Sequence, residues 1–467
     1  MNEARLTTSV SRMSSRSRAL TAHYEALERH VTVRRNFDYE QLVVPNGNGM
    51  EAIHRWFHLK EAFSRRLVAR VVKDLRLDQD DRLRILDPFA GSGTTAIAVA
   101  ELIQERTLKR AYALSYECNP FLHLVASTKL RALQTPTTSF LSLAQRVAAT
   151  AARDRIAPVP IPSLATFHND DYFDRADLDR LLQLRAAIEE ARQRGASELD
   201  ADLALLCLGG SVEPVSALRR DGRALRYVPD KRATRPISEF LRRAEQVQLD
   251  IPRRSTAITG RVQLGDGRTL RPRPPTNGTV DLVLFSPPYP NNIDYTEVYK
   301  LEAWLLGFIT NSAEFTRQRM KSVYSHPSIL RFETEPSLTA SLRQTVDELV
   351  EPLLDAVPEG RYHTARRSML SGYATDMLTT LQSSYRALRP GGHLVYVVGN
   401  SVHGSGNDRF LIAADLLIAR LATAVGFEIE SLEVARELRR RGFESRFLRE
   451  SVVFARRPTG RRRPAVS

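Results

Sequence analysis

Short, nearly continuous apolar runs alternate with longer amphipathic segments along much of this 467-residue chain. Such runs predict strands of a parallel sheet that is buried on both faces, and the amphipathic segments predict the helices that cover it. The predicted strands lie at 84–87, 111–117, 261–264, 280–285, 393–398, 427–432 and 450–454. The predicted helices lie at 51–78, 96–104, 121–133, 178–191, 199–208, 373–388 and 410–425. The alternation indicates an α/β fold.

Two long segments interrupt this alternation. Residues 131–260 are mainly helical in pattern, and residues 310–374 are polar. The first 50 residues form a polar, Arg-rich arm that ends in a turn signal at 46–49, and we expect this arm to be flexible or lightly docked. The basic tail at 458–467 is expected to be disordered.

The composition is that of a soluble globular protein, with 42% hydrophobic and 26% charged residues. No stretch approaches the roughly 18 uninterrupted apolar residues of a membrane span, and the Arg/Ser-rich start lacks the apolar segment of a secretory signal. A transit peptide stays an alternative, which Glu3 disfavours. Cys118 and Cys207 have no metal-ligand spacing and form no disulfide framework. We therefore expect a cytoplasmic protein without a metal site or a membrane partner.

The formal net charge is +14 and the sequence pI is about 10.0, which suits a polyanionic partner such as nucleic acid. A basic run near the end of the first insertion comprises Arg219, Arg220, Arg223, Arg226, Lys231, Arg232 and Arg235, with Tyr227 among them. Turn residues within the run predict a loop rather than a helix. This loop is the first candidate for nucleic-acid contact, because Arg binds phosphates and reads guanine edges. A solvated surface loop, or a generally basic proteome, is the alternative.

The apolar run at 280–285 stops at Ser286-Pro287-Pro288-Tyr289. Prolines cannot donate to a sheet ladder, and each one forces the residue before it into an extended conformation. The expected result, at the carboxyl end of a strand, is a rigid turn that carries a hydroxyl, free carbonyls and one aromatic ring. Open α/β sheets bind their ligands at this edge.

A second candidate site follows the run at 84–87, where residues 87–95 read DPFAGSGTT and lead into a helix. A strand, a glycine turn and a helix form a nucleotide-binding arrangement, in which Gly91 and Gly93 let a ligand approach the backbone. The turn lacks the lysine of a phosphate-binding P-loop and the third glycine of the dinucleotide fingerprint. Glu117 ends the next strand, where a carboxylate accepts hydrogen bonds from ribose hydroxyls.

Together, these motifs resemble those of the DNA amino-methyltransferases, which methylate cytosine N4 or adenine N6, and Ser-Pro-Pro-Tyr is the form typical of the cytosine-N4 enzymes. The resemblance covers roughly half of the chain, in blocks at about 51–130, 261–309 and 375–457. It implies a Rossmann-like S-adenosylmethionine-dependent methyltransferase sheet with helical insertions. It also implies that the cofactor is bound by Lys60, Phe63, Asp87, Phe89, Gly91, Gly93, Thr94, Glu117 and Asp266.

Three parts of this implied cofactor site have their own motifs. Residues 54–64 resemble the family's N-terminal cofactor-side motif, which would place Lys60, Phe63 and Ser64 near the methionine end, although a packing helix is an equal alternative. Asp87 suits the positive end of the cofactor. Asp266 matches the adenine-side motif, although Gly-Asp-Gly also forms an ordinary turn.

By the same resemblance, the catalytic residues are Ser286, Pro287, Pro288 and Tyr289. An exocyclic amine is a weak nucleophile, because its lone pair is delocalised into the base. Ser286 Oγ and the Pro287 carbonyl are expected to accept hydrogen bonds from the two N–H groups of the amine, which frees its lone pair. Tyr289 is expected to stack on the base. Methyl transfer is then direct, and a duplex substrate requires base flipping. Neither cysteine lies in the motif that a ring-carbon methyltransferase needs.

The predicted division of the chain follows from the resemblance. It comprises a basic N-terminal arm (1–50), the cofactor-binding half of the core (51–130), a mainly helical insertion (131–260), the catalytic half of the core (261–309), a second insertion (310–374), the C-terminal part of the core (375–457) and a basic tail (458–467). The first insertion follows the Glu117 strand, whereas family members with this motif order place the recognition domain after the Asp266-type motif. Either insertion is therefore a candidate for substrate recognition.

The substrate prediction is a cytosine amine in DNA, since Ser rather than Asp stands at position 286. Adenine N6 of DNA and an RNA amine stay alternatives, because the tetrapeptide occurs across these activities. An alternative of another class is a catalytically silent nucleic-acid-binding protein that keeps the fold as a scaffold. We predict a site-specific methyltransferase that acts on duplex DNA in a restriction-modification or defence system, with a cognate restriction nuclease as a candidate partner.

Overall fold

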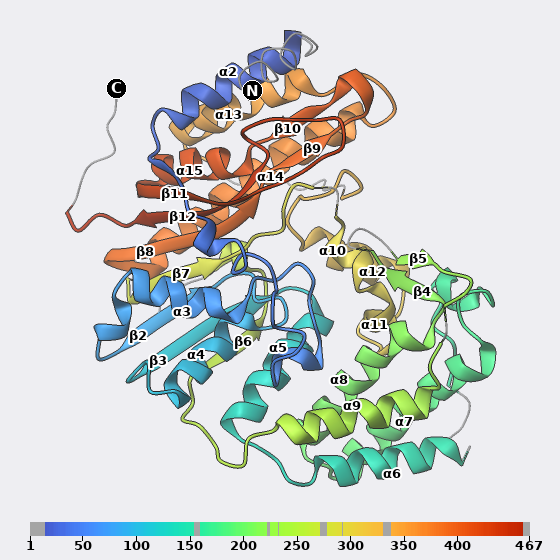
Figure 1. The fold of residues 1–467 in the computed structure, drawn as a ribbon. Helices are drawn as coiled ribbons and strands as arrows, with labels where there is room; N and C mark the ends of the chain where they lie inside the picture. The colour runs from blue at the N-terminus through green and yellow to red at the C-terminus, as the bar shows by residue number, and fades with distance from the viewer. Residues whose placement is uncertain are drawn as a thin grey trace.

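The computed structural model of the protein is an α/β structure in which helices cover both faces of a central sheet (Figure 1). It describes residues 15–153, 159–221, 225–231, 233–270, 278–291, 293–329 and 338–460. Some residues named in the predictions lie outside these ranges. They are the first 14 residues of the arm, Arg223, Arg232 and residues 461–467 of the predicted tail. No helix among the residues described is long and apolar enough to cross a membrane.

The central sheet has eight strands in the order β1-β11-β12-β8-β7-β2-β3-β6. The strands are β1 (Val33–Arg35), β2 (Leu83–Asp87), β3 (Ala111–Glu117), β6 (Gly260–Leu264), β7 (Val280–Phe285), β8 (Leu388–Gly399), β11 (Glu428–Glu437) and β12 (Arg449–Arg456). The pairs from β8 through β7, β2 and β3 to β6 are parallel, whereas β12 runs antiparallel to both β8 and β11. The mostly parallel sheet confirms the Rossmann-like fold predicted from the apolar runs.

The central strands are mostly apolar because their alternate side chains enter two different cores. In β7, Leu282 and Leu284 belong to one core, and Val283 and Phe285 belong to the other. The first core lies under α3 (Arg65–Asp74), α4 (Thr94–Gln104) and α5 (Pro120–Gln134). The second lies under α13 (Ala340–Ala356), α14 (His363–Ala387) and α15 (Ala414–Val425).

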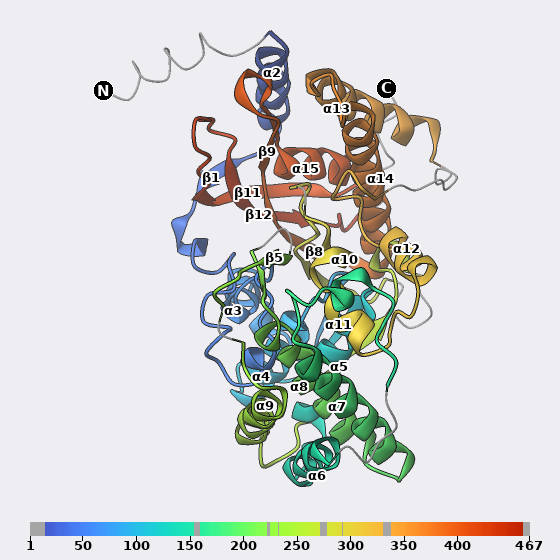
Figure 2. The same cartoon turned by 90° about the vertical axis from the view of Figure 1, so that its right-hand side faces the viewer.

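A helical group is attached at one end of the sheet and stands apart from it in both views (Figures 1 and 2). It comprises α6 (Phe140–Ala152), α7 (Arg175–Gln193), α8 (Glu198–Val215) and α9 (Pro236–Asp250). Part of the basic run forms a short hairpin on this group, with strands β4 (Leu218–Arg220) and β5 (Leu225–Tyr227), where the sequence predicted only a loop. The chain then returns to the sheet at β6.

The second insertion and the C-terminal core contribute shorter elements. These are α10 (Tyr295–Val298), α11 (Lys300–Leu305), α12 (Ser312–Met320), β9 (Ser401–His403) and β10 (Phe410–Ile412). The predicted helix at 373–388 begins ten residues earlier than expected, at His363, and the predicted helix at 410–425 begins at Ala414 because β10 occupies the residues before it.

Of the two predicted states of the N-terminal arm, flexible or lightly docked, the structure shows a docked arm from residue 15 onward. Helix α2 (Ser15–Glu28) lies against α13 and α15, and β1 adds a parallel edge strand to β11. Tyr24 is buried and its hydroxyl donates to the Leu411 carbonyl over 2.8 Å. This docking depends on a few buried side chains and on backbone pairing, which the polar composition of the arm does not reveal.

The predicted helix at 51–78 is wrong in extent, because the range contains only α3 (Arg65–Asp74), a 3-10 turn at His54–Trp56 and the start of another at Leu77–Gln79. The backbone between His54–Trp56 and α3 is held by side chains from elsewhere. Buried Lys129 donates to the carbonyls of His54 and Phe57 over 3.0 and 2.9 Å, and Asn48 donates to the Phe63 carbonyl over 2.9 Å. These bonds satisfy the backbone without a continuous helix.

Candidate active site

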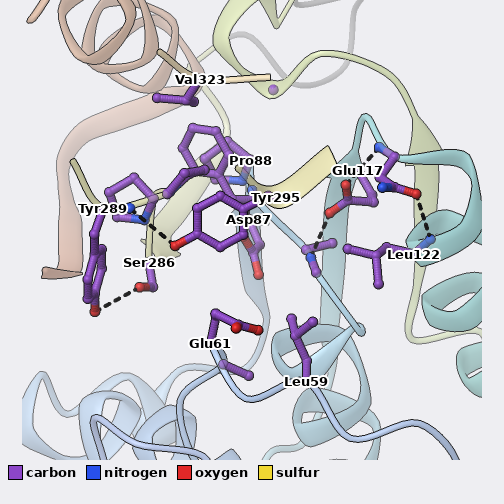
Figure 3. A pocket seen from close by; sticks show the side chains of 18 of the residues that line it. Leu59, Glu61, Asp87, Pro88, Glu117, Leu122, Ser286, Tyr289, Tyr295 and Val323 are labelled. Atoms are coloured by element: carbon purple, nitrogen blue, oxygen red, sulfur yellow. Dashed lines mark hydrogen bonds between the residues drawn. The ribbon is translucent and has the colours of Figure 1, made fainter. Parts of the chain in front are cut away.

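A cavity opens at the carboxyl ends of β2, β3 and β7 (Figure 3). Strand order reverses between β2 and β7, because β2 pairs with β3 on one side and with β7 on the other. Ligands of open α/β sheets bind in the crevice at such a switch point. The cavity has a volume of about 250 Å³.

Most of the residues predicted for the site line this one cavity. They are Lys60, Phe63, Asp87, Phe89, Gly91, Thr94, Glu117, Asp266, Ser286, Pro287, Pro288 and Tyr289. The glycine turn after β2 and the proline turn after β7 thus face the same space, as adjacent parallel strands require. Their individual roles stay predictions.

Gly93 is the exception, because it is not among the residues that line the cavity. It lies at φ 88° as the N-cap of α4, and a Cβ there would come within 3.1 Å of Ala126 Cα. Its place in the motif therefore reflects close packing of the turn on α5. Gly91, at φ 53°, does line the cavity, and a Cβ there would meet Leu59 Cδ2 at 2.7 Å.

Asp87 holds the glycine turn through two hydrogen bonds. One carboxylate oxygen accepts from the Phe89 amide over 2.9 Å and the other from Thr95 Oγ1 over 2.6 Å. Burial raises the pKa of Asp87 to about 6, and the hydrogen bonds from Thr95 and Phe89 partly offset this rise. The sequence assigned Asp87 to the positive end of a cofactor, but both of its oxygens are committed to the turn.

Glu117 holds the same turn from the tip of β3. Its two oxygens accept from the Gly91 amide and the Asn119 amide, both over 2.8 Å (Figure 3). Burial raises the pKa of Glu117 to about 7, against the effect of these amides. Each carboxylate oxygen keeps a further lone pair for a hydroxyl donor on the cavity side.

Asp266 lies on the far side of the cavity in a fixed ion pair. Both of its oxygens accept from the Arg268 guanidinium, and the shortest contact is 2.7 Å. Arg268 in turn donates to Asp376 on α14 over 2.7 Å. The pairing fixes the orientation of the Asp266 carboxylate without removing it from the cavity lining.

At the proline turn, the hydroxyls form a directed chain. Ser286 Oγ donates to the Tyr289 hydroxyl over 3.2 Å, and that hydroxyl donates to Glu450 Oε1 over 2.8 Å. Arg436 Nε donates to Glu450 Oε2 over 2.5 Å. Burial raises the pKa of Tyr289 well above its ordinary value, so the phenol keeps its proton.

Comparison with curated proteins shows which proteins this chain is similar to. No family model matches the chain, but three relatives align with most of it. Type II methyltransferase M.AvaI, from Nostoc sp. and from Anabaena variabilis, is 25% identical over 446 residues, which cover 84% of this chain and 83% of the relative. Type II methyltransferase M.BsoBI of Geobacillus stearothermophilus is 24% identical over 441 residues, which cover 83% of this chain and 81% of the relative. The chain is therefore similar, along most of its length, to type II methyltransferases.

Sequence reasoning missed several residues that line the cavity, among them Glu61, Tyr295, Arg436 and Glu450. Burial raises the pKa of Glu61, and the Tyr299 hydroxyl donates to it over 3.0 Å. Glu61 directly follows Lys60, which was predicted, so its position in the motif was a usable signal. Arg436 and Glu450 come from β11 and β12, more than 100 residues after the proline turn, and no local pattern marks them.

The basic hairpin formed by β4 and β5 is only partly a charged surface. Arg219 and Arg226 are exposed, but the Arg220 side chain is 12% exposed and pairs with Glu213 and with buried Glu302. Lys60 donates to the Arg220 carbonyl over 2.9 Å, which joins the hairpin to the cavity wall. Arg220 is therefore a structural residue, and the predicted nucleic-acid contact rests on its exposed neighbours.

Proposed function

We propose that the chain is an S-adenosylmethionine-dependent methyltransferase that modifies an exocyclic amine of DNA, with cytosine N4 as the target, within a restriction-modification or defence system. The observation that carries the proposal is the shared cavity of the glycine turn after β2 and the proline turn after β7. A cofactor held at one turn and a base held at the other would meet without any domain movement.

The residues around the glycine turn fit this cofactor in their charge. Glu61, Asp87, Glu117 and Asp266 are all acidic and line the cavity, which suits a cationic sulfonium with an amino group and ribose hydroxyls. When bound, S-adenosylmethionine supplies an activated methyl group.

Each cofactor contact has a candidate residue. Glu117 would accept from the ribose hydroxyls, Asp266 from the adenine amine, and Glu61 from the cationic end, with Gly91 allowing close approach. Lys60, Phe63, Phe89 and Thr94 complete the wall. Gly93 acts through packing and Asp87 through its brace on the turn.

The proline turn supplies the groups for the base. Ser286 Oγ and the Pro287 carbonyl would accept hydrogen bonds from the two N–H groups of the amine. These hydrogen bonds would draw the nitrogen lone pair out of conjugation with the base. Pro288 fixes the preceding backbone, and Tyr289 offers a ring for stacking. Serine at 286 supports cytosine over adenine as the target. A base in duplex DNA would reach this turn by flipping.

The helical group α6–α9 with its hairpin is proposed as the recognition part. Its hairpin meets the cavity wall through the bond from Lys60 to the Arg220 carbonyl, and its exposed Arg219 and Arg226 suit DNA phosphates. The net charge of +14 supports a nucleic-acid substrate.

The test is transfer of tritium from labelled S-adenosylmethionine to duplex DNA and, separately, to tRNA. Chromatography of the hydrolysed nucleosides then identifies the product. Label in N4-methylcytosine of DNA supports the proposal in full. Label in N6-methyladenine overturns the choice of base, label only in tRNA overturns DNA, and absence of cofactor binding in calorimetry supports the silent scaffold.

A further inference from the structure

Glu450 is placed to control the direction of the hydroxyl chain at the proline turn. It lies on β12, its side chain is 5% exposed, and it lines the cavity beside Tyr289 and Arg436. A carboxylate that is almost buried is costly unless it is paired, and here each oxygen has a donor. Strand β12 is antiparallel to β8, whose Gly399 pairs with Glu450, so backbone pairing fixes the position of the side chain.

The directions of the hydrogen bonds follow from the number of protons available. The carboxylate of Glu450 only accepts, so the single proton of the Tyr289 hydroxyl goes to it. The Tyr289 oxygen is then left as an acceptor, and it takes the single proton of Ser286. Because Ser286 Oγ donates its proton to Tyr289, its two lone pairs are left as acceptors.

We propose that Glu450 is a positioning residue for methyl transfer, which turns the Ser286 proton away from the target amine through Tyr289 and leaves Ser286 Oγ as a pure acceptor. The inference rests on the proposed function, because it assigns the orientation of the group that would accept the amine N–H. Arg436 Nε donates to the other Glu450 oxygen over 2.5 Å, which fixes the carboxylate beside Tyr289.

Glu450→Gln tests the direction of the chain with little change of shape. Arg436 holds the amide oxygen, so the amide NH₂ faces the Tyr289 hydroxyl. Tyr289 must then accept from the amide and donate its own proton to Ser286 Oγ, which occupies a lone pair that the amine needs. We expect kcat to fall by about 10- to 100-fold, with the calorimetric Kd for S-adenosylmethionine within about twofold of the wild type.

The matched control is Glu433→Gln. Glu433 is a carboxylate on the neighbouring strand β11, 6% exposed and bonded to Asn36, and it does not line the cavity. We expect this variant to keep the wild-type kcat. Circular dichroism and calorimetric cofactor binding are the measurements that check whether both variants are folded.

A double-mutant cycle with Tyr289→Phe separates positioning from general loss of structure. That change removes the hydroxyl through which Glu450 acts, so adding Glu450→Gln to it should cost no further activity. The inference would be overturned if Glu450→Gln lowered kcat by the same factor in the wild type and in Tyr289→Phe. An unchanged kcat in Glu450→Gln alone would also overturn it. If the wild-type chain transfers no methyl group to DNA, the proposed function fails and this inference fails with it. An active wild type with an unaffected Glu450→Gln variant overturns the inference alone.

Discussion

Gly399 sets the place of the Tyr289 ring, and Gly399→Ala is the sharpest test of that placement. Gly399 ends β8, and a Cβ built on it would lie 2.9 Å from Tyr289 Cε2 and 3.2 Å from Cδ2. Ordinary contact begins at 3.4 Å, so the ring must withdraw by at least about 0.5 Å. The ring cannot move alone, because its hydroxyl is bonded to both Ser286 and Glu450.

The expected loss can be scaled from the displacement. A misplacement of about 1 Å in a catalytic geometry costs on the order of 100-fold, so a shift of half that size should lower kcat by roughly tenfold. The strain of the added methyl group should also lower the free energy of unfolding by about 1 to 3 kcal/mol. Cofactor affinity should change little, because Glu117 lies on the opposite side of the cavity from Tyr289 (Figure 3).

The assay combines single-turnover methyl transfer with calorimetry for the cofactor and thermal unfolding. Gly265→Ala is the matched control, since its Cβ would lie 3.6 Å from Tyr116, an ordinary contact, and Gly265 does not line the cavity. A wild-type transfer rate in Gly399→Ala would refute the claim that the ring must be held in place. An equal fall in cofactor affinity would show that the two halves of the cavity are not independent.

The other predictions concern the acceptor, the substrate surface and pH. Ser286→Ala should lower the transfer rate by about 10- to 100-fold with cofactor affinity nearly unchanged, and an equally active variant would remove Ser286 from the mechanism. DNA affinity should fall steeply as the salt concentration rises. Arg219→Ala and Arg226→Ala should each reduce the slope of log K against log salt by about one. Unchanged slopes would show that neither side chain contacts a phosphate. Burial raises the pKa of Glu117 to about 7, and hydroxyl donors favour its ionised form. Cofactor affinity should therefore rise between about pH 6 and pH 8 in the wild type and stay flat in Glu117→Gln, as calorimetry across this range would measure.

The sequence predicted the parts of this molecule whose causes are local. An apolar run followed by a glycine turn and a helix gave β2, the turn and α4 within one or two residues, and the prolines at 287 and 288 marked the end of β7. Because both strands are parallel neighbours, the two turns had to open at the same edge.

The parts that failed depend on contacts between distant segments. Arg220 was predicted as a phosphate ligand within a basic run, yet it is folded over the rings of Phe57 and Tyr299 and bonded to buried Glu302. Glu450 looked like an ordinary charge at the start of a strand, and only the sheet order places it against Tyr289. A single sequence does not encode such pairings in any local pattern.

The edge strand β1 has a consequence for how the chain folds as it is made. It pairs with β11, and Asn36, one residue past the strand, bonds to Glu433, 397 positions later. A ribosome therefore releases the first strand of the sheet long before its neighbour exists, and closing so large a loop is slow. Helix α2 cannot dock until α13 emerges, and β1 cannot pair until β11 emerges. A chaperone that shields nascent apolar segments would bind the chain during this interval.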